Sequence, residues 1–76
     1  MSDILVRYGK AVRKFRNKKM LSQEDFADKC GLHRTYISDV ELGKRNVSLE
    51  NVERISDALD MSIADIFIEV ESYKTS

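Results

Sequence analysis

The chain has 76 residues, of which 42% are hydrophobic and 34% charged, with 13 basic and 13 acidic side chains. This length supports one small domain over residues 1–76, and the single cysteine and single histidine exclude an intrachain disulfide and a zinc site built from these residue types alone. No apolar stretch is long enough to span a membrane, and the start lacks the apolar segment of a signal peptide, so we expect a soluble cytoplasmic protein with no membrane partner.

Helices are the only regular elements that the sequence predicts, because it has no proline and no sustained alternation of polar and apolar residues. The first helix is expected over residues 4–18, where apolar side chains recur at spacings of three and four residues and basic side chains fill most other positions. The apolar positions are Leu5, Tyr8, Val12 and Phe15.

The second and third helices are bounded by residues typical of helix ends. Ser22 is expected to cap the second helix, with Asp25 reaching back to the cap amide, and Gly31 to close it after about residue 29. The third helix is expected over residues 34–42, before Gly43.

The fourth and fifth helices also follow serine caps. Ser48 precedes the fourth, which places Leu49, Val52, Ile55 and Leu59 on one face. Ser62 precedes the fifth, expected over residues 63–70, and Asp65 completes a second capping box there. The final residues, SYKTS, are expected to fray. Five short helices with short connections predict a compact all-α domain.

The charges are unevenly distributed along the chain. Residues 1–46 hold eleven Lys and Arg against six acids, a net of +5, whereas residues 47–76 hold two against seven, a net of −5. A basic half can face a polyanion while an acidic half stays away from it. The same distribution also suits an ordinary solvated surface, so charge alone leaves both interpretations open.

Residues 23–42, QEDFADKCGLHRTYISDVEL, have the spacing of a helix-turn-helix. Two helices joined by a short glycine-containing turn can cross steeply if a small residue lies at their contact and apolar residues fill the angle. Ala27 is the small contact residue and Gly31 the turn. The apolar filling consists of Phe26, Cys30, Leu32, Ile37 and Val40.

The segment SQEDFADKCGLHRTYISDVELG resembles the Cro/CI, lambda-repressor-like helix-turn-helix family, whose pattern is S-Q-E-x-[apolar]-A-x-x-x-G-[apolar]-x-x-x-x-I-S-x-x-E-x-G. The resemblance covers about residues 12–70 and implies a five-helix DNA-binding domain. Within this family, RTYIS followed by E and RN-x-SL is similar to the controller proteins of restriction-modification systems, which are small dimeric regulators. RTYIS followed by RN also occurs in other stand-alone regulators of the superfamily.

The resemblance implies that the third helix enters the major groove of DNA and reads base edges with its exposed side. The candidate base-reading residues are Arg34, Thr35, Ser38 and Asp39. Arg34 can donate two hydrogen bonds to guanine O6 and N7, and Thr35 offers a hydroxyl and a methyl group suited to thymine. Asp39 could accept from cytosine N4 or orient Arg34.

A second set of residues is expected at the DNA backbone, where contacts set register without reading sequence. The resemblance implies that Gln23 contacts a phosphate and braces the recognition helix, and His33 lies at the start of that helix. Tyr36 is expected either to touch a phosphate or to pack over the turn. The remaining candidates are Arg16, Lys18, Lys19, Lys44, Arg45 and Asn46.

The fifth helix is more apolar than the end of so small a domain requires, which indicates self-association. Ile63, Ile66 and Phe67 can serve the core, whereas Ile68 and Val70 are expected to lie partly outside it, and we expect these five residues to form a homodimer interface. A two-fold dimer predicts a pseudo-palindromic site with half-sites about 34–36 Å apart. The alternative is that the helix only caps the core.

Metal, cofactor and enzyme functions are not expected. Cys30 and His33 have C-x-x-H spacing, but Cys30 occupies a core position and no second ligand pair accompanies it. Serine, histidine and aspartate are available for a catalytic triad, but so small a helical domain offers no evident pocket.

We therefore expect a homodimeric, sequence-specific DNA-binding transcription regulator. The resemblance implies a restriction-modification controller that acts on its own promoter and both activates and represses. Activation would require contact with RNA polymerase, for which Asp39, Glu41 and Glu50 are candidates. The alternatives are a phage-type repressor, an antitoxin-like autoregulator and, from another class, a protein-binding adaptor without DNA contact. An adaptor should lack Gln23 and Arg34, which are both present.

Overall fold

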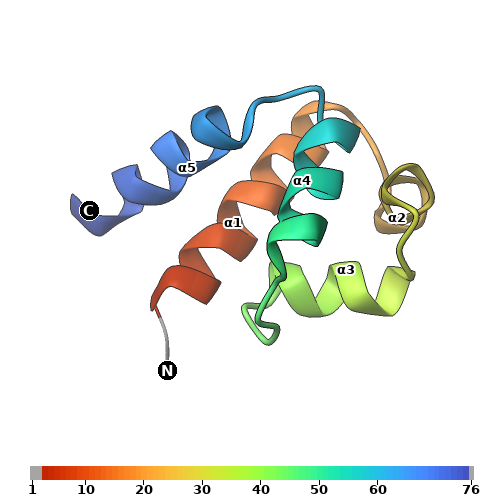
Figure 1. Cartoon of the computed structure of the whole chain (residues 1–76), viewed down its shortest axis with the longest axis horizontal. Helices are drawn as coiled ribbons and strands as arrows, with labels where there is room; N and C mark the ends of the chain where they lie inside the picture. The colour runs from red at the N-terminus through yellow and green to blue at the C-terminus, as the bar shows by residue number, and fades with distance from the viewer. Residues whose placement is uncertain (1–2, 76) are drawn as a thin grey trace.

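The structure is a computed structural model that describes residues 3–75, in which five α-helices and a terminal 3-10 turn are the regular elements (Figure 1). They are α1 (Asp3–Lys18), α2 (Gln23–Cys30), α3 (Arg34–Glu41), α4 (Leu49–Ala58), α5 (Ile63–Ser72) and η1 (Tyr73–Thr75). The all-α prediction is confirmed, and the expected helix ends are correct to within two residues. The expectation that the tail frays is wrong for residues 72–75, which finish α5 and form the 3-10 turn, and Ser76 lies outside the described residues.

Three helices begin at serine caps, as expected. The hydroxyl oxygens of Ser22, Ser48 and Ser62 accept the backbone N–H of the third following residue at 3.0, 3.1 and 3.0 Å. These bonds satisfy backbone donors that have no partner inside the helix. A return bond from the carboxylate of Asp25 or Asp65 to its cap amide is not found among the described residues, so each capping box is only half formed.

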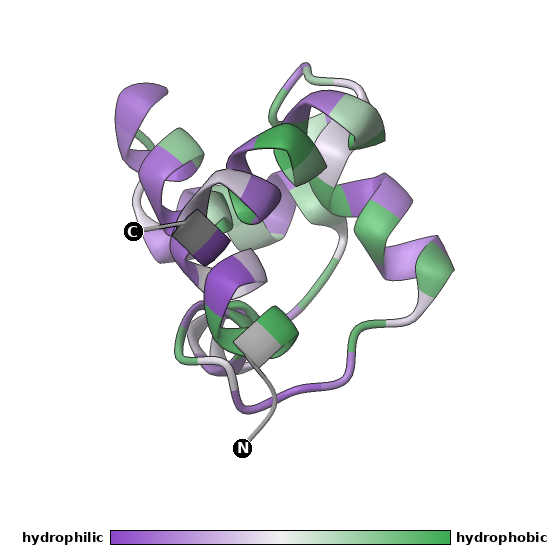
Figure 2. Ribbon diagram, turned by 90° about the vertical axis from the view of Figure 1, so that its left-hand side faces the viewer, coloured by the Kyte–Doolittle hydropathy of each residue, from purple (hydrophilic) through white to green (hydrophobic). Residues whose placement is uncertain are grey.

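The long helix α1 lies in the middle of the fold, and α5 packs against both α1 and α4 (Figure 1). It packs against α5 and α3, while α2 packs against α3 and α4. Figure 2 shows hydrophobic and hydrophilic residues alternating along the helices, as expected when each helix buries one side. The largest fully buried side chains are Phe26, Ile37, Ile55, Leu59, Ile66, Val12, Val40 and Val70.

The buried side of α1 differs from the expected one. Tyr8 and Val12 are buried as predicted, but Leu5 and Phe15 are only half-buried. Gly9 is buried because the end of α3 approaches the α1 backbone there: a Cβ atom at Gly9 would lie 2.7 Å from the carbonyl oxygen of Glu41. Glycine at this position therefore permits direct contact between two helix backbones.

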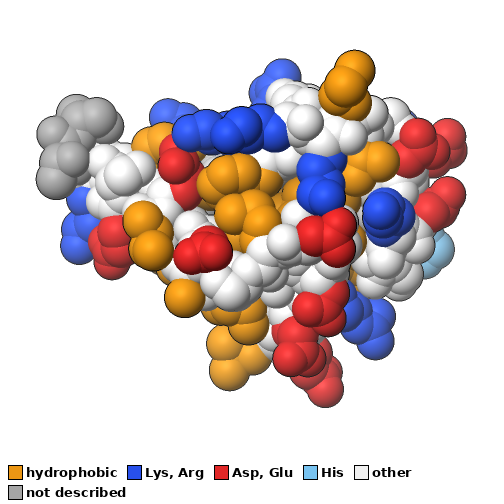
Figure 3. Space-filling view, turned by 90° about the horizontal axis from the view of Figure 1, so that it is seen from above, with side chains coloured by type: hydrophobic (Ala, Val, Ile, Leu, Met, Phe, Trp, Pro, Cys, Tyr) orange, Lys and Arg blue, Asp and Glu red, His pale blue; other side chains and the backbone are white. Residues whose placement is uncertain are grey.

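Several large hydrophobic side chains remain exposed among the described residues. They are Ile4, Met20, Leu42, Leu49, Ile63 and Ile68. Figure 3 shows hydrophobic side chains gathered in the middle of one face and projecting at one edge, bordered by charged groups of both signs. Across residues 3–75, none of the helices combines the length and apolarity needed to cross a membrane.

Candidate nucleic-acid interface

Helices α2 and α3 form the predicted helix-turn-helix. Ala27, the predicted contact residue, is buried, and Gly31 ends α2 with a φ of 71°, a left-handed conformation that glycine adopts without strain. The Leu32 N–H donates to the Ala27 carbonyl at 2.9 Å and closes the turn. Because Ile37 and Val40 are buried against the other helices, the opposite side of α3 must face outward.

The outward side of α3 carries the residues proposed to read bases. Arg34 and Thr35 are exposed in its first turn, and Ser38 and Asp39 are half-buried one turn later. His33 is exposed at the N-cap and makes no side-chain capping bond. The structure therefore brings these residues together at the N-terminal end and outer side of one helix.

Asp39 does not orient Arg34, and this part of the sequence-based interpretation is wrong. Its carboxylate instead pairs with the Nε of Arg45, at 3.4 Å. The guanidinium of Arg45 also lies over the ring of Tyr36, 5.1 Å from its centroid. An ion pair and a cation–π contact thus hold a cation of the following loop beside α3.

Tyr36 connects the recognition helix to α4. Its side chain is half-buried, and its hydroxyl accepts a hydrogen bond from Asn51 Nδ2 at 3.0 Å. This contact favours the packing role over the phosphate role for Tyr36. Sequence reasoning missed Asn51, because no local pattern relates it to a tyrosine fifteen residues earlier.

Gln23, the first residue of α2, is tied to the end of α3. Its Nε2 donates to Glu41 Oε1 at 3.1 Å, a contact suited to the predicted bracing of the recognition helix. The Glu41 side chain is only 4% exposed. Glu41 is therefore not available to contact RNA polymerase, and that suggestion is wrong.

Three cations of α1 and the turn after it were proposed to contact the DNA backbone. Two of them already form ion pairs within the protein. Arg16 is buried, and its guanidinium donates to Glu41 and to the Leu21 carbonyl, so the proposed phosphate contact of Arg16 is wrong. Lys19 pairs with Asp60 at 2.7 Å. Lys18 remains exposed, as do Lys44, Arg45 and Asn46 in the loop after α3.

The separation of charge along the chain is partly cancelled in space. Arg7, Lys14 and Lys19 from the basic half pair with Glu71, Glu69 and Asp60 from the acidic half, at 3.8, 2.8 and 2.7 Å. Hydrogen bonds from the lysines are the main reason that the pKa values of Glu69 and Asp60 are lowered. Pairing therefore removes part of the basic charge of α1, whereas Arg34 and Lys44 form no ion pair within residues 3–75.

Comparisons with known proteins agree with this geometry. Residues 12–66 match the helix-turn-helix family model. The control protein C.MunI from Mycoplasma sp is 47% identical over 72 residues, which cover 93% of this chain and 97% of C.MunI. The chain belongs to the restriction-modification controller proteins.

Solved structures of other controller proteins have the same fold. That of C.AhdI from Aeromonas hydrophila has a TM-score of 0.81 at 44% identity and covers 83% of this chain and 96% of its own. That of the C.Esp1396I tetramer in complex with its natural 35 base-pair operator has a TM-score of 0.88 at 33% identity and covers 95% of both chains. The helix-turn-helix prediction and the narrower family prediction are both confirmed.

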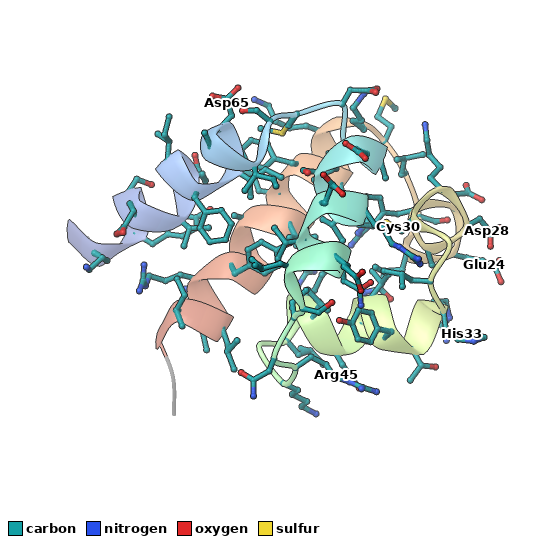
Figure 4. The ribbon with its side chains drawn as sticks, in the orientation of Figure 1. Glu24, Asp28, Cys30, His33, Arg45 and Asp65 are labelled. Carbon is teal, nitrogen blue, oxygen red and sulfur yellow. The ribbon has the colours of Figure 1, made fainter. Side chains whose placement is uncertain are left out.

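The C-x-x-H pair of this controller protein does not converge on one site. Cys30 lies on the inner side of α2 and is buried, whereas His33 is at the outer end of α3 (Figure 4). Burial raises the pKa of the Cys30 thiol to about 11, which disfavours the thiolate that a metal would need. No group of three potential metal-binding His, Cys, Asp or Glu side chains occurs within residues 3–75.

Two of the five α5 residues proposed for the dimer interface differ in burial from the expectation. Ile66 and Val70 are 1% and 0% exposed, so Val70 does not lie partly outside the core as predicted. Ile63 and Ile68 are 42% and 67% exposed, so Ile63 is not a core residue. Phe67 is half-buried and stacks on Tyr8 with 5.4 Å between ring centroids. Of the five, only Ile63, Phe67 and Ile68 have surface to offer a second copy.

Proposed function

We propose that this controller protein is a homodimeric, sequence-specific DNA-binding transcription regulator that acts on its own operon and on the endonuclease gene. The observation that carries the proposal is the two-sided recognition helix. Its inner side is fixed by the buried Ile37 and Val40, and its outer side exposes Arg34 and Thr35. A guanidinium in the first turn of such a helix is suited to guanine O6 and N7 in the major groove.

A controller function is favoured over the other regulatory classes by the extent of the similarity to control proteins. The shared sequence with C.MunI spans nearly both whole chains, which leaves no room for an additional effector domain in that relative. A phage-type repressor or an antitoxin-like autoregulator is disfavoured, because the chain belongs to the controller proteins. An adaptor without DNA contact is disfavoured because the exposed side of α3 is polar and begins with a cation.

Dimers on DNA would place two recognition helices on one face, about one helical turn apart along the duplex. C.Esp1396I is a tetramer on its operator, and we infer that two dimers of the present protein can likewise occupy one control region. Filling the first site would permit activation and filling the second would repress. Glu50 remains an exposed candidate for contact with RNA polymerase, whereas Asp39 is half-buried and paired. This function would place the protein in the cytoplasm.

The test is a footprint on the DNA directly upstream of the protein's own gene, repeated at several salt concentrations. Arg34→Ala should weaken protection about tenfold or more and relax the sequence preference at one base pair of each half-site, because a bidentate guanine contact is lost. Affinity of the unaltered protein should fall steeply with salt as counterions are released.

Lys74→Ala is the matched control, because it also removes one exposed cation but lies in η1, on a different element from α3. It should leave the footprint unchanged. If Arg34→Ala does not change the footprint, or if Arg34→Ala and Lys74→Ala change it equally, the base-reading proposal is overturned. A flat salt response would favour the adaptor.

A further inference from the structure

A buried network joins three helices beneath the proposed DNA surface. Arg16 of α1 holds both carboxylate oxygens of Glu41 in α3, with Nε to Oε2 at 2.6 Å and Nη2 to Oε1 at 3.0 Å. The two side chains are only 9% and 4% exposed. The third nitrogen of Arg16, Nη1, donates to the carbonyl of Leu21 at 2.8 Å, just before α2 begins. Arg16 thus fixes the entry to α2 and the end of α3 at once.

The network ends at Gln23, whose amide it orients. A carboxylate only accepts hydrogen bonds, so the Nε2 of Gln23 must face Glu41, and it does so at 3.1 Å. This leaves one N–H of Nε2 and the carbonyl Oε1 for other partners. A phosphate also only accepts, so the remaining N–H is the side-chain group with which Gln23 can bind one. Orienting the amide in advance removes part of the entropy cost of that contact.

The charge of the network also matters at this place. An unpaired Glu41 carboxylate, one hydrogen bond away from Gln23, would repel an approaching phosphate. The bidentate bond from Arg16 cancels that charge inside the protein. The backbone at the first turn of α2 adds free N–H groups beside Gln23, because the first donors of a helix have no internal acceptor.

We propose that Arg16 and Glu41 are positioning residues of the DNA interface. They hold the Gln23 amide with its free N–H available to a DNA phosphate and keep the site beneath it electrically neutral. This inference rests on the proposed DNA-binding function. It replaces the direct phosphate contact of Arg16 with an indirect one through Glu41 and Gln23.

The experiment is a double-mutant cycle measured as affinity for a labelled duplex that spans the DNA directly upstream of the protein's own gene. Gln23→Ala is made in the unaltered protein and in an Arg16→Met/Glu41→Met background, which removes both charges together so that neither is left buried and unpaired. Gln23→Ala should weaken binding about tenfold in the unaltered protein and less than about twofold in the background variant. Thermal unfolding followed by circular dichroism checks that each variant is folded.

The salt dependence separates positioning from direct contact. The Arg16→Met/Glu41→Met variant should bind more weakly with the same slope of log affinity against log salt, because the neutral pair releases no counterion. If Arg16 touched a phosphate, the slope would fall by about one. That result, or a Gln23→Ala effect equal in both backgrounds, would overturn the inference.

Arg16→Lys provides a second cycle if the double variant does not fold. Lysine keeps the charge but cannot hold both oxygens of Glu41 in a planar fork, so the Gln23→Ala effect should drop from about tenfold to about threefold. An undiminished effect would count against positioning. Arg34→Ala is measured alongside: if it weakens binding while Gln23→Ala does not, the inference fails and the proposed function stands. If the unaltered protein does not bind the duplex, the proposed function fails.

Discussion

At the scale of single residues, Gly9 shows that helix propensity alone does not decide whether a residue suits its position in a helix. Glycine in a helix interior costs about 1 kcal/mol relative to alanine, so the position looks unfavourable in isolation. In the fold it lies against the last carbonyl groups of α3, where an added methyl group would meet the backbone oxygens of Val40 and Glu41. Those oxygens belong to a helix end that Arg16 also holds, so they have little freedom to move.

Gly9→Ala should therefore destabilise the protein by about 2 kcal/mol, since overpacking against the backbone outweighs the gain in helix propensity. The measurement is urea unfolding followed by circular dichroism at neutral pH. Lys10→Ala, at the exposed neighbouring position of α1, should change stability by less than about 0.5 kcal/mol. Increased stability of Gly9→Ala would contradict the close approach of α1 and α3.

At the scale of elements, α5 is attached to α1 by apolar packing and by polar contacts along its length. Ile66 and Val70 are buried against the core, the Arg7 guanidinium donates to the Val70 carbonyl at 3.2 Å, and Lys14 Nζ donates to Glu69 at 2.8 Å. The bond from Lys14 is the main reason that the pKa of Glu69 is lowered, with a smaller contribution from a hydrogen bond with Tyr73. The attachment of α5 consequently depends on pH.

Because the folded-state pKa of Glu69 lies below its ordinary value of 4.5, its contribution to stability is present above that value and is lost as the pH falls through the folded-state pKa. The unfolding free energy of the unaltered protein should thus fall more steeply between pH 5 and pH 3, both rough bounds, than that of Glu69→Gln. Denaturant unfolding at several pH values tests this.

Glu53→Gln is the control for the acid prediction, because Glu53 is an exposed acid of α4 that forms no ion pair within residues 3–75. The unfolding free energy of Glu53→Gln should change with pH in the same way as that of the unaltered protein over the acid range. Parallel pH profiles for the unaltered protein and Glu69→Gln would show that the Lys14 contact contributes nothing to stability.

At the scale of the whole molecule, an apolar surface on α5 remains after the core is complete. Ile68 is 67% exposed and Ile63 42% exposed, on a helix whose other apolar residues are buried or half-buried. In a single small domain, exposed residues of this kind on one helix favour contact with a second copy. The proposed two-fold arrangement on DNA needs such a contact.

Ile68→Glu should convert a dimer at tens of micromolar, a rough working range, into a monomer, because each symmetric interface would bury two unpaired carboxylates. Sedimentation velocity without DNA is the measurement. Leu42→Glu, a similar change at an exposed leucine after α3, should leave the dimer intact. A protein that is monomeric at this concentration and unaffected by Ile68→Glu would refute the proposed interface.

The sequence by itself determined the helices and the helix-turn-helix. Apolar spacing, the serine caps and Gly31 act within a few residues of one another, so they can be recognised without knowing how the helices pack. The outward orientation of Arg34 and Thr35 followed from the same local rule, because Ile37 and Val40 had to face inward. These are properties of one helix and its ends.

The tertiary structure decided which charged groups are free and which apolar residues are covered. Arg16 was expected at the surface because it lies among basic residues, but its partner Glu41 is 25 residues away, on a helix that only folding brings to it. Asp39 pairs with Arg45 instead of Arg34 because the loop after α3 brings Arg45 beside that helix, and Val70 is covered because α5 packs along α1. Side-chain partners are set by the distance between helices in space, which no periodicity within one helix encodes.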